Sequence, residues 1–125
     1  MSGLSHKPSR RLKTGHTVLE AILIAKDLTQ KNLFQIGDPE IANELAELGY
    51  PGEEAMIKAL LTALDEVTPS DYRPPGQPDK IPGVPFVWSS KCFKTSMYLK
   101  FKLLGTKRKP VLWWYSCHPA TDFKL

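Results

Sequence analysis

Two segments near the C-terminus carry side chains that could perform chemistry together. Tyr98, Lys100 and Lys102 alternate along the first segment, and Ser116 and His118 lie at the end of the second. Histidine exchanges protons near neutral pH, tyrosine donates hydrogen bonds, and lysine neutralises phosphate charge. Cleavage of RNA by attack of a ribose 2′-hydroxyl on its own 3′-phosphate needs a base, an acid and cations. These residue types therefore predict metal-free RNA cleavage, with Tyr98, His118 and Lys100 as candidate catalytic residues.

Charge is segregated along the chain. Residues 80–119 contain eight Lys or Arg and no Asp or Glu, whereas residues 17–79 contain four basic and twelve acidic residues. The formal net charge of +4 hides this division. Such a split predicts an acidic helical layer and a basic sheet layer that face different partners, the basic layer attracting a polyanion.

A β-hairpin is expected to position the candidate catalytic residues. Residues 95–104 alternate between apolar and polar side chains, and a basic loop at 105–109 leads to a second strand at 111–118. If the loop centres near residue 107, Tyr98 opposes Ser116 and Lys100 opposes Trp114. Alternation then puts these residues on one polar face: Tyr98, Lys100, Lys102, Trp114, Ser116 and His118. The apolar face receives Trp113, Tyr115 and Cys117.

The same region supplies candidate RNA contacts. Basic side chains are expected on phosphates, aromatic rings on bases, and Ser116 as a hydrogen-bonding group. The predicted phosphate contacts are Arg73, Lys91, Lys94 and Lys102, and the predicted stacking residues are Trp88 and Trp114. Each residue alone also fits an ordinary surface or core position, so the prediction depends on their gathering on one face.

Three helices are expected before the sheet. Thr17 and Glu20 have the spacing of a capping box, so the first helix is expected to begin at Thr17 and to bury Leu19, Ile22 and Leu23. A second helix is expected with Asp38 as its cap and Pro39 at its first position, ending at Gly49. The third helix is expected over residues 53–66, with this buried side: Met56, Ala59, Leu60, Ala63, Leu64 and Val67.

Length and composition bound the architecture. A chain of 125 residues with 42% hydrophobic residues is expected to form one globular domain. Within a domain at 16–125, we expect a helical layer over about 17–72, a proline-rich loop at 73–85 and a sheet over about 86–118. Residues 1–15 are expected to form a basic, mobile arm. The predicted fold class is α+β, with N-terminal helices packed on a small antiparallel sheet.

Several classes of protein are disfavoured. No apolar run approaches the length of a membrane span, and the N-terminus lacks the apolar core of a signal peptide, so a cytoplasmic protein without membrane contact is expected. Cys92 and Cys117 are expected to be buried free thiols. The histidines and cysteines lack metal-ligand spacing, and no metal or other cofactor is expected.

The order of motifs resembles the MqsR family of toxin ribonucleases over about residues 17–120. The matching segments are Glu47-Leu48-Gly49-Tyr50, Val67-Thr68-Pro69-Ser70-Asp71-Tyr72, Val87-Trp88, Met97-Tyr98-Leu99-Lys100-Phe101 and Ser116-Cys117-His118. The resemblance implies a RelE-like fold and metal-independent cleavage of single-stranded mRNA, which inhibits translation and growth. It also implies a bacterial toxin-antitoxin pair in which a cognate antitoxin protein binds this chain.

Site residues follow from the resemblance position by position. The active-site tyrosine of the family falls on Tyr98, and the lysine in its last strand falls on His118, which performs acid–base chemistry more readily than lysine. Two further family positions are changed. Pro74 stands where the family has a lysine, leaving Arg73 as the nearest cation, and Ser89 stands where the family has a glutamine.

Two other interpretations remain open on the sequence. The basic sheet could serve a non-catalytic nucleic-acid-binding or regulatory module, which binds RNA in a strongly salt-dependent way without cleaving it. The acidic helical layer could instead be the important surface, as a binding face for another protein.

Overall fold

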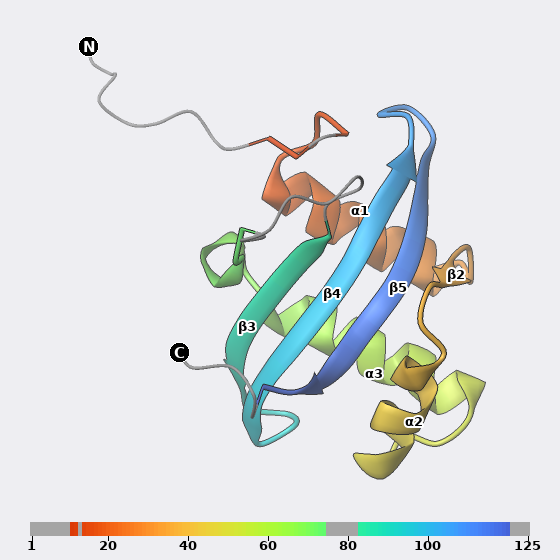
Figure 1. The fold of residues 1–125 in the computed structure, drawn as a ribbon, viewed down its shortest axis with the longest axis vertical. Coiled ribbons are helices and arrows are strands. Elements are labelled where there is room, and N and C mark those ends of the chain that lie inside the picture. The colour runs from red at the N-terminus through yellow and green to blue at the C-terminus, as the bar shows by residue number, and fades with distance from the viewer. Residues whose placement is uncertain (1–10, 13, 75–82, 121–125) are drawn as a thin grey trace.

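The computed structural model describes residues 11–12, 14–74 and 83–120 (Figure 1). Most of the predicted arm and of the proline-rich loop lies outside these residues. The described part is an α+β fold, as predicted. Its elements are α1 (Val18–Gln30), β2 (Gln35–Ile36), α2 (Glu40–Glu47), α3 (Glu53–Glu66), the 3-10 helix η1 (Pro69–Asp71), β3 (Val84–Ser90), β4 (Thr95–Gly105) and β5 (Pro110–Pro119).

The sheet has the strand order β2-β5-β4-β3. The three long strands form an antiparallel meander, as predicted. The expectation of a purely antiparallel sheet is wrong, however, because β2 pairs parallel with β5, placing Gln35 beside Trp113. The chain can add this parallel strand because two α-helices, a 3-10 helix and two longer strands separate β2 from β5, which leaves room for a crossover.

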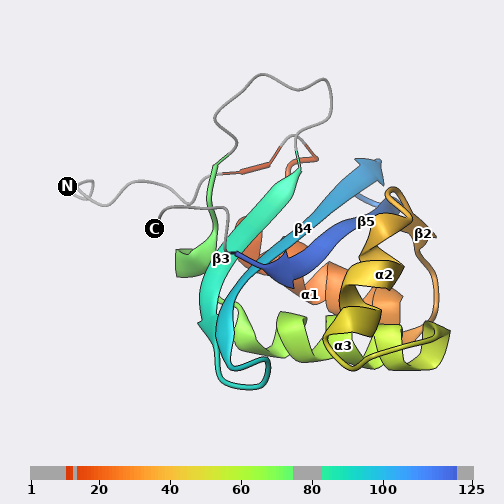
Figure 2. The ribbon, with the colours of Figure 1, turned by 60° about the horizontal axis from the view of Figure 1, so that its bottom comes forward.

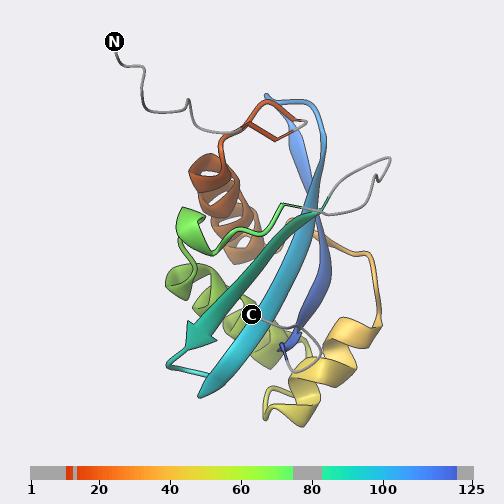
Figure 3. The same cartoon turned by 60° about the vertical axis from the view of Figure 1, so that its left-hand side comes forward.

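Two helices cover one face of the sheet, and the other face is largely bare. Figure 3 shows α1 and α3 together on one side of the long strands, with the opposite side open over most of its length. Between helices and sheet lies a single apolar core, whose largest fully buried members are Trp114, Phe86, Phe101, Ile41, Leu45, Leu60, Leu64, Met97, Leu99 and Leu112. The remaining α-helix, α2, contacts both β5 and α3, and Figure 2 shows it beside the β2–β5 side of the sheet.

The start of α1 is confirmed, but of its predicted buried residues only Ile22 is buried. Thr17 caps the helix, with its amide 2.8 Å from Glu20 Oε1 and the Glu20 amide 3.1 Å from Thr17 Oγ1. Leu19 and Leu23 are 52% and 54% exposed, while Ile22 and the smaller Val18, Ala21 and Ala25 are buried. Small residues at the contact allow α1 and α3 to approach closely, and this tertiary packing overrides the preference of leucine for the core.

The second and third helices follow the prediction with one boundary change. α2 begins at Glu40 rather than at Pro39, although Asp38 Oδ1 still accepts the Glu40 amide at 3.0 Å. Gly49 follows the helix with a φ of 98°, as expected for a glycine that ends it. α3 has the predicted range, and its predicted apolar side is buried.

The last residues of the predicted arm are ordered against the domain. Arg11 forms a bridge with Thr17, and the Leu12 amide donates to His16 O at 2.8 Å. His16 is only 4% exposed, and its Nε2 lies 3.1 Å from the carbonyl oxygen of Lys107 in the β4–β5 loop. The buried imidazole of His16 therefore ties residues 11–12 and 14–15 to the domain, so these residues of the predicted arm are held against it.

Candidate functional site

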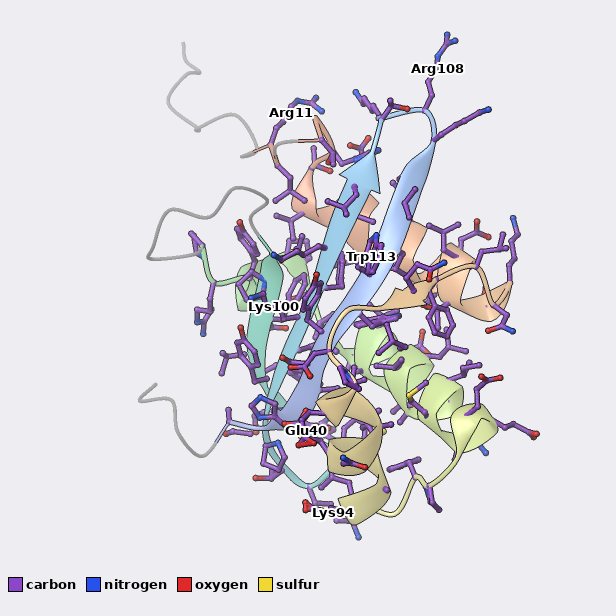
Figure 4. The ribbon with its side chains drawn as sticks, turned by 45° about the vertical axis from the view of Figure 1, so that its right-hand side comes forward. Arg11, Glu40, Lys94, Lys100, Arg108 and Trp113 are labelled. Carbon is purple, nitrogen blue, oxygen red and sulfur yellow. The ribbon has the colours of Figure 1, made fainter. Side chains whose placement is uncertain are left out.

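The face of the sheet that is turned away from α1 and α3 carries half of the predicted site residues, including all three candidate catalytic residues. We call it the outer face, and it contains Tyr98, Lys100, Lys102, Trp113, Tyr115, Ser116 and His118. Cross-strand pairs join Tyr98 to His118, Lys100 to Ser116 and Lys102 to Trp113. Figure 4 shows Lys100 and Trp113 on this side of the hairpin.

The predicted register of the hairpin is wrong for two reasons. The loop pairs Gly105 with Pro110, which shifts the register by one residue, and a bulge in β5 shifts it by one more. Lys100 pairs with Ser116, but the next residue, Phe101, pairs with Trp114, so Tyr115 is an extra residue in β5. A bulge of one residue inverts the inside–outside alternation beyond it. Ser116 and His118 therefore share the face of Tyr98 as predicted, whereas Trp114 turns inward.

Tyr98 and His118 face each other directly. Their ring centroids are 5.3 Å apart, with the rings tilted by 36°. Burial raises the pKa of the Tyr98 hydroxyl, which keeps it protonated and able to donate. His118 Nδ1 lies 2.8 Å from the carbonyl oxygen of Pro119. Because a carbonyl only accepts, Nδ1 carries a proton, and in the neutral imidazole Nε2 is the acceptor nitrogen.

The two lysines of the outer face converge on one aromatic ring. Lys100 Nζ and Lys102 Nζ lie 5.7 Å and 4.9 Å from the centroid of Tyr115. The Tyr115 ring rests against Gly37, where a Cβ atom would overlap it. The stem of Lys100 passes over Gly83 in the same close manner. These contacts hold two positive charges and an aromatic surface beside the Tyr98–His118 pair.

Both tryptophans predicted to stack on bases are buried, and these two predictions are wrong. Trp114 is 0% exposed, its ring packs edge-on against Phe101, and its Nε1 donates to Thr29 Oγ1 at 3.1 Å. Trp88 is 6% exposed, and its Nε1 donates to Glu66 Oε1 at 3.0 Å. Trp88 points inward because it pairs with the core residue Met97. The outer face offers half-buried Trp113 instead, which sequence reasoning assigned to the core.

The other predicted cations lie around the edges of the outer face. The Arg73 amide donates to Pro85 O at 2.9 Å, and Pro85 is the β3 partner of Lys100. Lys91 and Lys94 are exposed in the β3–β4 turn, and Figure 4 shows Lys94 at the end of the hairpin. The structure therefore places Arg73 beside the edge strand and these two lysines at one end of the sheet. It does not gather them around His118.

The two altered family positions are both at the surface. Pro74 is exposed after η1, and Ser89 is exposed on β3, where it pairs with Ser96 on β4. Neither side chain supplies a cation near the Tyr98–His118 pair.

Glu66 anchors the β3–β4 turn and was missed by sequence reasoning. Its carboxylate accepts hydrogen bonds from the Trp88 ring, the Ser90 hydroxyl and the amides of Lys91 and Cys92. Although partial burial alone raises the pKa of Glu66, the hydrogen bonds from Ser90, Trp88 and Cys92 outweigh it and lower the pKa to about 2. The last residue of α3 thus fixes the turn that carries Lys91.

Glu44 on α2 is a second residue that the sequence did not reveal. Its Oε2 lies 4.0 Å from His118 Nε2, and its side chain is 30% exposed. Burial is the main reason that the pKa of Glu44 lies above its ordinary value, and His118 opposes this shift. More than seventy positions separate Glu44 from His118 in the chain, so only the packing of α2 against β5 brings them together.

The two cysteines differ in environment. Cys117 is buried, and burial raises the pKa of its thiol to about 12, so it is protonated and unreactive at neutral pH. Cys92 is free but exposed, so the expectation that both thiols are buried is wrong for Cys92. Among the described residues, no three His, Cys, Asp or Glu side chains are grouped so that they could hold a metal ion.

Comparison with known proteins gives no relative for this chain: no protein family, no curated protein and no solved structure matches it. In the described part of the chain, none of the helices has both the length and the apolar character required to cross a bilayer.

Proposed function

We propose that this protein is a metal-independent endoribonuclease that cleaves single-stranded mRNA, with Tyr98, His118 and Lys100 as its catalytic residues. The observation that carries the proposal is the direct pairing of Tyr98 with His118 on an open sheet face, two residues along each strand from the pair formed by Lys100 and Ser116. A proton-transferring ring, a hydroxyl donor and a cation are the groups that this cleavage requires.

The proposed reaction begins with a phosphodiester lying across β4 and β5. Lys100 neutralises a non-bridging phosphate oxygen, and the protonated Tyr98 hydroxyl donates to the pentavalent phosphorane as negative charge builds on it. Lys102 and Arg73 contact neighbouring phosphates, and Ser116 hydrogen-bonds beside Lys100. Attack by the 2′-hydroxyl leaves a 2′,3′-cyclic phosphate and a free 5′-hydroxyl, with His118 transferring one of the two protons.

Base recognition in this proposal depends on Trp113 and Tyr115 rather than on the two buried tryptophans. Both rings lie on the outer face, and Tyr115 is flanked by two lysines. A single-stranded base can stack on such a ring while the adjoining phosphate meets a cation. The enzyme therefore prefers RNA whose bases are unpaired.

The biological role proposed here is that of a toxin. The motif order resembles the MqsR family, and the parallel β2 followed by an antiparallel meander is compatible with a RelE-like toxin fold. In this role the protein acts in the bacterial cytoplasm, inhibits translation by degrading mRNA, and is neutralised by a cognate antitoxin.

A second function is favoured by a separate observation. Lys100, Lys102 and Tyr115 form a cation–aromatic surface that does not require any chemical role of His118. A non-catalytic RNA-binding module would use that surface alone and would leave RNA intact.

Expression in bacteria tests the proposed role. Wild-type protein should arrest growth and deplete mRNA, whereas His118→Ala should do neither while accumulating as folded protein. Gln30→Ala, an exposed change on α1 away from the outer face, is the matched control and should remain toxic. Toxicity that survives in His118→Ala refutes the catalytic assignment, and toxicity without mRNA loss favours the binding module.

A further inference from the structure

A carboxylate approaches the proposed catalytic pair from outside the sheet. α2 stands beside the end of β5, and Figure 4 shows it in front of that end of the strand. Glu40 and Glu47 on this helix are exposed, whereas Glu44 is half-buried and turned toward His118. One glutamate of the helix is thus placed at the site while its neighbours face solvent.

The geometry of His118 makes this approach chemically significant. Nδ1 is committed to the carbonyl oxygen of Pro119, so Nε2 is the nitrogen available for proton transfer. That same nitrogen lies 4.0 Å from Glu44 Oε2. The two groups are therefore close enough for both to contact one phosphodiester, and neither hydrogen-bonds the other so tightly that it must be broken first.

The surroundings of Glu44 favour its acting as a base. Tyr98 from β4, Cys117 and His118 from β5, and Asp38, Glu40 and Glu47 from its own segment are the titratable groups around the pair. Burial and the three neighbouring carboxylates raise the pKa of Glu44, against the opposing effect of His118. A carboxylate with a raised pKa accepts a proton more readily than an ordinary one.

We propose that Glu44 is the general base of RNA cleavage and His118 the general acid. This inference rests on the proposed ribonuclease function. Glu44 takes the proton of the 2′-hydroxyl as the 2′-oxygen forms its bond to phosphorus. The bond from phosphorus to the 5′-oxygen breaks, and the leaving oxygen receives the Nε2 proton of imidazolium His118. The products are a 2′,3′-cyclic phosphate, a 5′-hydroxyl, protonated Glu44 and neutral His118, so a single proton exchange with water resets the pair.

A purely structural role for Glu44 makes a different prediction. If the carboxylate only orients the imidazole, its removal lowers activity at every pH by a similar factor. If Glu44 is the general base, activity falls in acid because Glu44 becomes protonated, so replacing Glu44 should abolish this fall.

The test is a pH–rate profile in EDTA with a short single-stranded RNA. Wild type should give a bell-shaped kcat/KM profile whose acid limb has its midpoint above the ordinary glutamate value. Glu44→Gln keeps the size of the side chain and should lower kcat by about 100-fold or more, abolish the acid limb and leave KM within about 3-fold. Glu44→Asp should recover part of the activity together with the acid limb. Glu54→Gln, an exposed change on α3, should match wild type.

The outcomes separate the two proposals. Cleavage by wild type together with unchanged cleavage by Glu44→Gln, or with an acid limb that persists in Glu44→Gln, overturns the role of Glu44 and leaves the ribonuclease standing. Absence of cleavage by wild type overturns both. If circular dichroism shows that Glu44→Gln does not fold, Glu44→Asp becomes the test. Full activity of Glu44→Asp, with the acid limb at the wild-type midpoint, overturns the inference.

Discussion

The Glu66 carboxylate is predicted to stabilise the fold in a pH-dependent way. It accepts hydrogen bonds from the Trp88 ring, the Ser90 hydroxyl and two amides of the β3–β4 turn. Replacing it by glutamine removes the charge and leaves only one oxygen to accept these four donors, so some donors lose their partner.

The shift in the pKa of Glu66 sets the magnitude. A change from the ordinary value of 4.5 to about 2 corresponds to a ceiling of about 3.4 kcal/mol at neutral pH. Because the carboxylate is partly exposed, water screens much of this energy, and we expect Glu66→Gln to lower the free energy of unfolding by about 1–2 kcal/mol. Since the folded-state pKa is lowered, the stabilisation is complete above about pH 4.5 and is lost as the pH falls toward 2.

Urea denaturation followed by circular dichroism at a series of pH values measures the effect. The difference between wild type and Glu66→Gln should be largest at neutral pH and should shrink steadily in acid. Glu47→Gln, an exposed glutamate without these donors, should change stability by less than about 0.5 kcal/mol at any pH. A Glu66→Gln difference that stays constant from neutral to acid pH refutes the role assigned to the charge.

Four further predictions concern the two faces of the sheet. Trp114→Ala should lower the free energy of unfolding by about 3–5 kcal/mol in urea denaturation, because its ring is fully buried. Trp113→Ala should weaken RNA binding in a fluorescence titration at a stability cost below about 1.5 kcal/mol. If Trp113→Ala instead causes the large loss of stability and Trp114→Ala weakens RNA binding, the inward position of Trp114 that the bulge produces is contradicted. Gly37→Ala should lower the thermal midpoint and RNA affinity together, because the added methyl displaces the Tyr115 ring. Binding should fall steeply with salt, and Lys102→Ala should reduce the slope of log K against log salt by about 1; an unchanged slope shows that Lys102 makes no phosphate contact.

Local sequence signals predicted much of the fold. The capping box at Thr17, the apolar side of α3 and the alternation along β4 depend on neighbours in the chain, and all three are observed. Tyr98, Lys100 and Lys102 share a face because nothing interrupts β4. The Gly49 helix end follows from backbone conformation alone.

The errors arise where tertiary structure decides. The buried residues of β5 are Leu112, Trp114 and Cys117, so the interval between successive buried residues changes from two positions to three at the bulge. Trp113, Trp114 and Tyr115 are all aromatic, so the sequence does not indicate where the inside–outside alternation is inverted. The inward turn of Trp88 likewise depends on its pairing with Met97 across β3 and β4.

The site was incomplete for the same reason. Glu44 reaches His118 only because α2 packs beside β5, a contact between distant segments that no local pattern encodes. Parallel pairing of β2 with β5 helps to place α2 there, since the helix begins four residues after the end of that strand. Helix amphipathicity indicates which side of α2 is apolar, but not which of its glutamates meets the sheet.

The most direct test of the central claim is the fate of RNA with purified protein in EDTA. Single-stranded RNA should be cut to fragments with 2′,3′-cyclic phosphate and 5′-hydroxyl ends, and His118→Ala should cut at least about 100-fold more slowly. RNA that stays intact with the wild-type protein, or is cleaved equally by His118→Ala, contradicts the account.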